Sequence, residues 1–240
     1  LTPIFLDERL ASDRSPMVLQ LMEALTQKAI AVAGTPDAGI WEYRTEWKPQ
    51  TFSSLMCWAA ADRMANIASR HAPHHELEFR EAAERIRQEI CAKAWSDRAR
   101  SFGGHYEGDD LDASLLQMAR LRFLPSDEPR LHSTIDAIRA NLADGALLFR
   151  YQVNDGFGKP SVAFLICTFW LVEALAALGR RDEARAVFEK AIALLTPLGL
   201  MSEDYETATM RMWGNFPQTY SHAGLINAAF AASPTWPEVL

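Results

Sequence analysis

The sequence has few cysteines and no closely spaced pair of them. Its three cysteines, Cys57, Cys91 and Cys167, are odd in number and far apart, so neither a zinc ribbon nor a thioredoxin-type CxxC motif is present. Cys57 and Cys167 lie in apolar stretches, where thiols usually pack as small hydrophobic groups. We therefore expect all three to be reduced and buried, which is typical of a cytoplasmic protein.

The chain also lacks long apolar runs and an excess of basic residues. No stretch reaches the length of about 20 apolar residues that a membrane-spanning helix needs, and no signal peptide is recognisable. The formal net charge is −7, and this mild acidic excess argues against nucleic acid, because binding a phosphate backbone needs a basic face. We therefore expect neither a nucleic-acid partner nor a membrane partner.

No motif for an organic cofactor or a bound metal is evident, and we expect none. The stretch RHAPHHELE contains His71, His74 and His75. Because a proline interrupts it and no second cluster of ligands follows, we interpret it as a solvated helix cap. His222 is interpreted as a histidine at a helix start whose ring is satisfied by hydrogen bonds.

Helical periodicity accounts for most of the chain, of which 49% is apolar. No convincing alternating pattern indicates strands, and no low-complexity linker divides the sequence. We therefore predict one all-α unit of antiparallel helical hairpins, with residues 1–15 as an N-terminal extension or remnant and 16–240 as the main domain. The predicted helices span residues 16–33, 51–70, 75–95, 111–119, 130–142, 161–178, 183–195 and 221–232.

Aromatic residues gather in the predicted loops. Aromatic rings stack on the C–H face of a sugar, while carboxylates and arginines bind the surrounding hydroxyls. Loops that combine aromatic and charged side chains therefore favour a cleft for a polar ligand. The residues concerned are Trp41, Tyr43, Trp47, Phe102, Tyr106, Tyr151, Phe157, Trp213, Phe216 and Tyr220.

Two glutamates in these loops suit the cleavage of a glycosidic bond, which typically requires a pair of carboxyl groups. Glu42 lies between Trp41 and Tyr43, where aromatic surroundings would desolvate the carboxyl group, as a general acid requires. Glu203 lies in the acidic stretch SEDYE, which suits a general base. Spacing alone does not distinguish either residue from a helix cap or a solvated surface group.

Seven stretches of the chain, in order, resemble motifs of glycoside hydrolase family 15, the family of glucoamylases and bacterial trehalases. The first contains Glu42 and the sixth contains Glu203. The resemblance covers nearly the whole chain from residue 16 and is to the C-terminal portion of the family's catalytic domain. The stretches are PDAGIWEYR (36–44), FSSLMCWAAADRMANIA (52–68), LDASLLQMARLRFLP (111–125), RYQVNDGFG (150–158), FLICTFWLVEALAALGRRDEARAVFEKA (164–191), GLMSEDYE (199–206) and WGNFPQTYSHAGLINAA (213–229).

This resemblance implies an (α/α)6 barrel, in which twelve helices form two rings. It also implies hydrolysis of a terminal α-linked glucose with inversion, with Glu42 as general acid and Glu203 as general base. The leading prediction is a glucoamylase-like exo-hydrolase of α-glucans, and the alternative within the family is a trehalase. Residues that the resemblance places in the substrate site are Arg150, which would bind the sugar at the non-reducing end, and Trp41, Arg44 and Trp213.

The predicted helices are fewer than the twelve of the family's barrel. The missing ones would precede residue 16, so we expect self-association or an N-terminal region to cover the open barrel. A function of another class is also open, because EALAALGRRDEARAVFEKAIAL (173–194) resembles a tetratricopeptide hairpin and would favour a non-catalytic helical module. The pattern occurs once, whereas such modules are repeated, so the enzyme remains the leading interpretation.

Overall fold

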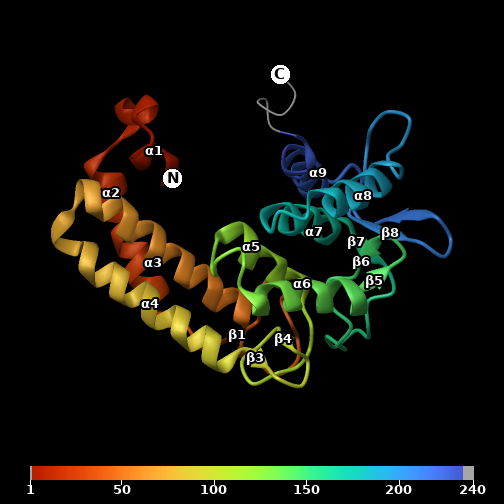
Figure 1. Cartoon of the computed structure of the whole chain (residues 1–240), viewed down its shortest axis with the longest axis horizontal. Coiled ribbons are helices and arrows are strands. Elements are labelled where there is room, and N and C mark those ends of the chain that lie inside the picture. The colour runs from red at the N-terminus through yellow and green to blue at the C-terminus, as the bar shows by residue number, and fades with distance from the viewer. Residues whose placement is uncertain (1, 235–240) are drawn as a thin grey trace. The chain divides into compact units, whose positions relative to one another are not determined.

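The computed structural model describes residues 2–234, except for the side chain of residue 13. The chain divides into two compact units, Leu1–Trp95 and Ser96–Leu240. Helices dominate both units (Figure 1), so the predicted all-α class is confirmed. The predicted division after residue 15 stays a prediction, and its outer ends, residues 1 and 235–240, lie outside the described part.

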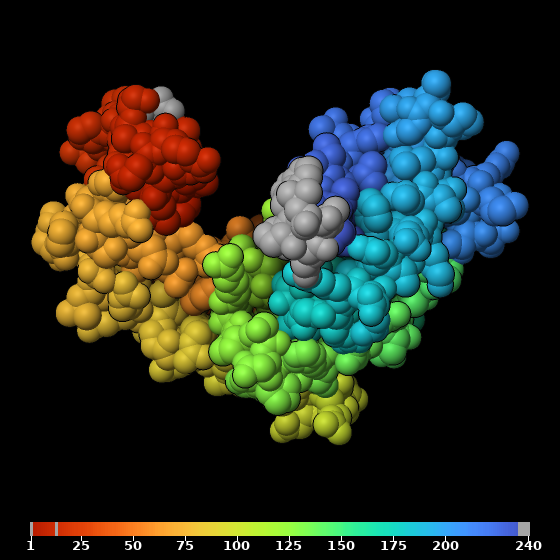
Figure 2. Space-filling view, turned by 45° about the horizontal axis from the view of Figure 1, so that its top comes forward, coloured from red at the N-terminus to blue at the C-terminus, as the bar shows by residue number. Residues whose placement is uncertain are grey.

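Unit 1 is a group of three long helices with a short N-terminal segment. The hairpin of α3 and α4 forms its centre, and α2 packs against α3 (Figure 1). The N-terminal segment closes one end of these helices (Figure 2), where Phe5 joins Met64, Ile67 and Phe79 in a buried apolar cluster. The elements are α1 (Thr2–Leu6), η1 (Glu8–Asp13), α2 (Pro16–Val32), α3 (Thr51–His71), η2 (Pro73–His75) and α4 (Glu76–Lys93).

Unit 2 is arranged around one largely buried and mostly apolar helix, α7 (Leu165–Ala177), which packs against α5, α8 and α9. Gly224 allows α9 to approach closely, since a Cβ atom there would lie 2.4 Å from Cδ1 of Ile166. The predicted helix over 161–178 begins later than expected, because Ala163 and Phe164 form a strand. The other helices are η3 (Ala113–Leu116), α5 (Gln117–Leu121), α6 (Pro129–Asn141), α8 (Arg181–Ile192) and α9 (Thr219–Ala232).

Within residues 2–234, nine short strands occur where the sequence pattern indicated none. Each has two or three residues, which is too few for an alternating pattern. They form three two-stranded sheets and the antiparallel sheet β7–β8–β9. The strands are β1 (Pro36–Asp37), β2 (Lys48–Pro49), β3 (Trp95–Ser96), β4 (Ser101–Phe102), β5 (Ala143–Asp144), β6 (Leu147–Leu148), β7 (Ala163–Phe164), β8 (Asp204–Glu206) and β9 (Arg211–Trp213).

The three cysteines are free thiols. Cys167 is buried in α7, whereas Cys57 and Cys91 are half-buried, so the expectation of full burial is correct only for Cys167. Burial raises the pKa of the Cys167 thiol well above its ordinary value, which keeps it protonated. Among the helices of residues 2–234, none combines the length and the apolar character that crossing a membrane requires.

Candidate active-site segments

A two-stranded hairpin in unit 1 holds the loop that carries Glu42. Strands β1 and β2 pair antiparallel, with Asp37 opposite Lys48, and so close the loop of residues 38–47 at its base. The carboxylate of Asp37 accepts hydrogen bonds from the Gly39 N–H (2.6 Å) and from the Ser53 hydroxyl (2.7 Å). Because Ser53 lies in the first turn of α3, these bonds fix the loop to the start of that helix.

Glu42 lies in this loop with a left-handed backbone, at φ +55°. A residue with a Cβ atom adopts this conformation at an energetic cost, and such strain concentrates at functional sites. The Glu42 N–H donates to Gly39 O (3.3 Å) and the Tyr43 N–H to Ala38 O (2.8 Å), so backbone bonds maintain the conformation. The Glu42 side chain is exposed while Trp41 and Tyr43 are half-buried, so the expected aromatic enclosure of Glu42 is not found.

The segment before β8 holds Glu203 in unit 2. The Glu203 N–H donates to Asn215 O (3.0 Å), and Glu203 O accepts from the N–H of Leu165 (3.1 Å) at the start of α7. Two residues earlier, the Met201 N–H donates to Nε2 of His222 in α9 (3.2 Å). This bond confirms the interpretation of His222 as a satisfied structural histidine. Glu203 is therefore tied to the starts of two core helices.

One oxygen of the Glu203 carboxylate is held in place. Its Oε2 accepts hydrogen bonds from the backbone N–H (3.0 Å) and the side-chain Nδ2 (2.8 Å) of Asn215. Gly214 makes room for this arrangement, because a Cβ atom there would lie 2.8 Å from Oε2 of Glu203. Among the described residues, Oε1 accepts no hydrogen bond, so that oxygen is left to bind water.

Asp204 is the neighbour whose ionisation is most affected by this arrangement. Its pKa is raised from the ordinary 3.8 to about 6, mainly by burial and then by the nearby Glu203 carboxylate, while Arg150 opposes the rise. Asp204 pairs with Trp213 of β9, whose indole Nε1 donates to the Glu206 carboxylate (3.2 Å). Trp213 is half-exposed, so one face of its ring is accessible.

Arg150 is the cation of this part of unit 2. Its backbone carbonyl accepts from the Ala113 N–H (2.9 Å), and its guanidinium carbon lies 5.1 Å from the centre of the Tyr151 ring. Tyr151 donates its hydroxyl proton to Asp155 (2.6 Å), which holds the segment together. The buried Nε of Arg150 has no hydrogen-bond partner among the described residues. An unpaired buried donor beside Asp204 suits a ligand oxygen.

The predicted site residues therefore fall into two groups. Unit 2 brings Arg150, Glu203 and Trp213 onto adjoining segments, whereas Trp41, Glu42 and Arg44 belong to the loop of unit 1. Sequence reasoning missed the residues that position the two glutamates. These residues, Asp37, Gly214 and Asn215, lay in the recognised motifs without a signal of their own, whereas Asp204 lay in the acidic SEDYE stretch.

Over residues 2–234, no group of three or more histidine, cysteine, aspartate and glutamate side chains is arranged to hold a metal ion. Within the cluster predicted as a helix cap, His71 Nε2 contacts Phe5 O (2.7 Å) and His75 Nδ1 contacts the Glu78 carboxylate (3.3 Å).

Comparison with solved structures defines the class of protein. The fold matches a bacterial glucoamylase complexed with acarbose, with a TM-score of 0.73, 18% identity, and coverage of 96% of this chain and 39% of that one. The chain therefore contains part of an (α/α)6 barrel.

The family model for glycosyl hydrolases family 15 matches residues 11–230, and the chain belongs to this family. A trehalase of Mycolicibacterium smegmatis is 38% identical over 206 residues, which are 84% of this chain and 31% of the relative. A trehalase of Thermoplasma volcanium is 35% identical over 198 residues, covering 81% and 32% respectively. The chain thus spans about a third of the length of these relatives.

Proposed function

We propose that the protein hydrolyses trehalose with inversion of configuration. The observation that carries this proposal is the family match together with trehalases that are 30–38% identical to the chain. The likeness to glucoamylase is 18% identical and concerns the fold alone. The glucoamylase-like activity that led the sequence interpretation therefore becomes the second candidate, and both act on a carbohydrate.

In the proposed mechanism Glu42 protonates the glycosidic oxygen and Glu203 removes a proton from the attacking water. The held Oε2 of Glu203 fixes the orientation of the carboxylate, and its Oε1 accepts the water proton. Arg150 donates from Nε to a sugar hydroxyl, while Trp41, Arg44 and Trp213 line the sugar. Inversion requires the two carboxyl groups to stand about 6.5–9.5 Å apart, with the water between them.

The stereochemistry of the released glucose tests this proposal. Proton NMR of the purified chain with trehalose should show one β-glucose and one α-glucose per bond cleaved, because only the attacked unit is inverted. Maltooligosaccharides cleaved by the same mechanism would initially release β-glucose alone. Turnover of maltooligosaccharides but not trehalose would favour the glucoamylase reading. Release from neither sugar would contradict the proposal for this chain.

Variants of the two glutamates test their roles. Glu42→Gln and Glu203→Gln should each lower kcat by about 10²- to 10⁴-fold, the usual contribution of a general acid or base. Glu46→Gln is the matched control, since Glu46 is an exposed glutamate of the same loop as Glu42. A loss in Glu46→Gln as large as in Glu42→Gln would contradict the assignment of the acid.

We also propose that the protein needs further polypeptide against this chain. Apolar side chains on the outer face of α2 are exposed, with Met17 at 74%, Leu21 at 54% and Leu25 at 58%. Ile226 and Phe230 form a second exposed apolar face on α9. Faces of this kind are usually covered, either by a second copy or by the part of the barrel that the relatives contain.

The free cysteines suit the reducing conditions of the cytoplasm, where we place the protein.

A further inference from the structure

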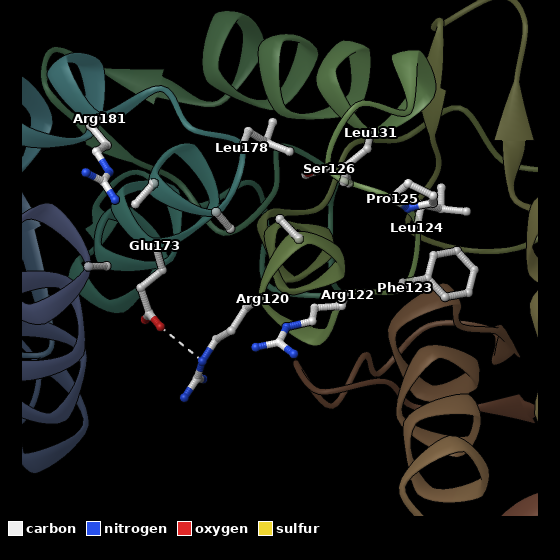
Figure 3. A pocket seen from close by; sticks show the side chains of 14 residues that line it. Arg120, Arg122, Phe123, Leu124, Pro125, Ser126, Leu131, Glu173, Leu178 and Arg181 are labelled. Atoms are coloured by element: carbon white, nitrogen blue, oxygen red, sulfur yellow. Dashed lines mark ion pairs between the residues drawn. The ribbon is translucent and has the colours of Figure 1, made fainter. Parts of the chain in front are cut away.

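A pocket of about 820 Å³, shown in Figure 3, lies in unit 2 beside the C-terminal part of α7. Leu165 begins α7 and binds Glu203 O, whereas Glu173, eight residues later, lines the pocket. Eight residues of helix correspond to about 12 Å along the axis. None of the residues named above for the substrate site lines this pocket, so it is a separate feature of unit 2.

The pocket contains a buried carboxylate that is only half satisfied. Glu173 is 8% exposed, and its Oε2 lies 3.0 Å from Nε of Arg120. The other oxygen, Oε1, is buried and has no hydrogen-bond partner among the described residues. Burial raises the pKa of Glu173 and Arg120 opposes the rise. An unsatisfied buried carboxylate oxygen is costly, so this atom calls for a donor from outside the chain.

Three arginines line the same pocket as this carboxylate, and one of them, Arg120, is paired with it. Arg120, Arg122 and Arg181 line the pocket together with Glu173, which leaves a formal charge of about +2 on its wall. In Figure 3 the guanidinium groups of Arg120 and Arg122 extend into the same open space beside the Glu173 carboxylate. Guanidinium groups bind oxyanions through paired N–H donors, so the pocket favours a ligand that carries a carboxylate or phosphate.

The rest of the pocket leaves room for a small molecule. Its remaining wall includes short or apolar side chains such as Ala176 and Leu131. A volume of about 820 Å³ falls in the range of about 300–1,000 Å³ that is usual for ligand sites. The pocket thus combines apolar side chains, one buried carboxylate oxygen without a hydrogen-bond partner among the described residues, and three arginines.

We propose that this pocket binds a hydroxylated anion, either a sugar phosphate or a sugar acid. A ligand hydroxyl donates to Oε1 of Glu173, and the oxyanion is bound by Arg122, whose guanidinium group extends into the same space as that of Arg120. The site is independent of the proposed hydrolysis and lies on the helix whose start is bonded to the Glu203 segment. It is therefore a second ligand site on the same core helix.

Isothermal titration calorimetry of the full chain tests the proposal, with glucose 6-phosphate, glucuronate and glucose as probes. Both charged sugars should bind more tightly than glucose, and the tighter of the two identifies the oxyanion. Arg122→Gln should weaken binding of the charged sugars at least tenfold, because it removes an exposed cation of the pocket. Binding of glucose, including any at the catalytic site, should not change in this variant.

Arg185→Gln is the matched control, since Arg185 is exposed on α8 and does not line this pocket. It should bind all three probes within twofold of the unmodified chain. Glu173→Leu should also weaken binding of the charged sugars, and circular dichroism checks that this variant folds. If Glu173→Leu does not fold, the result with Arg122→Gln alone tests the proposal. Absence of binding, equal affinity for glucose, or equal losses in Arg122→Gln and Arg185→Gln would overturn the proposal.

Discussion

The side chains proposed for catalysis are held by different kinds of interaction. Glu42 owes its position to a strained backbone within a hairpin loop, and its side chain is exposed. Glu203 owes its position to hydrogen bonds from Asn215 to one carboxylate oxygen. The fixed carboxylate of Glu203, with one oxygen that accepts no hydrogen bond from the described residues, suits the removal of a proton from water. The carboxyl group of Glu42 is exposed, so its environment depends on the groups that bind beside it.

The buried carboxyl group of Asp204 should make stability depend on pH. Its folded pKa is raised from 3.8 to about 6, so it contributes stability below pH 4 that is lost as the pH rises through 6. Asp204→Asn is neutral throughout, and the melting temperature of this variant should therefore rise relative to the unmodified chain between pH 4 and 7. Thermal melts across this range measure the difference.

Asp127→Asn serves as the control for that experiment, since Asp127 is exposed in a turn. Its melting curve should stay parallel to that of the unmodified chain. If the difference in melting temperature between Asp204→Asn and the unmodified chain became smaller with rising pH, the pKa of Asp204 would not be raised by folding.

Gly214 should be the least replaceable residue beside the proposed base. It has φ +75°, and a Cβ atom would press on the Glu203 carboxylate. Gly214→Ala should lose about 1–3 kcal/mol of unfolding free energy and lower kcat as Glu203 is displaced. Urea denaturation and steady-state kinetics measure the two effects.

Gly145→Ala separates backbone strain from steric clash. Gly145 has φ +64°, but a Cβ atom there meets nothing within 4 Å. This variant should lose about 1 kcal/mol and keep its kcat. Equal losses of kcat in the two variants would contradict the steric role of Gly214.

At the scale of elements, charged residues join the helices on the outside of unit 2. Glu183 of α8 binds Arg139 of α6 and also Arg180 (2.7 Å), and Arg180 binds Asp136 of α6 (2.7 Å). Hydrogen bonds from Arg180, and then from Arg139, lower the pKa of Glu183 to about 2. The ion pairs hold α8 against α6 where no sheet connects these helices.

Glu183→Gln should therefore weaken this contact at neutral pH. Glu183 is 41% exposed and screened by solvent, so the expected loss is below about 1 kcal/mol. Because a lowered pKa contributes stability above the unfolded value of 4.5, the difference from the unmodified chain should shrink as the pH falls from 4.5 toward 2. Calorimetric melts at pH 7 and pH 3 measure it, and Glu189→Gln, an exposed change on the same helix, should leave both melts unaltered.

At the scale of the whole molecule, exposed apolar helix faces should govern association. The double variant Leu21→Gln, Leu25→Gln should reduce self-association or aggregation of the chain, measured by light scattering coupled to size-exclusion chromatography. Leu77→Gln is the control, because Leu77 is 65% exposed on the charged helix α4. A monomeric unmodified chain that stays stable at high concentration would contradict the proposal of a covered face.

Particular stretches show how far sequence reasoning reached. Helices such as α2, with Pro16 at its first position, were predicted because capping and 3.6-residue periodicity are local properties. Strand β7 was missed and was included in a predicted helix, because Ala163 pairs with Tyr205, some forty residues away. A two-residue strand leaves no periodic trace, so only the partner reveals it.

The sequence by itself determined the family, the helical class and the identity of the two candidate glutamates, since these depend on motifs and local patterns. The tertiary structure decided that Asn215 holds Glu203, that half-buried Asp204 has a raised pKa beside it, and that Glu173 has an unpaired oxygen in a pocket lined by arginines. These features arise between residues distant in the chain. Hydrogen bonds, desolvation and cavities depend on which atoms are close together in the folded chain. Local sequence patterns do not determine these long-range contacts.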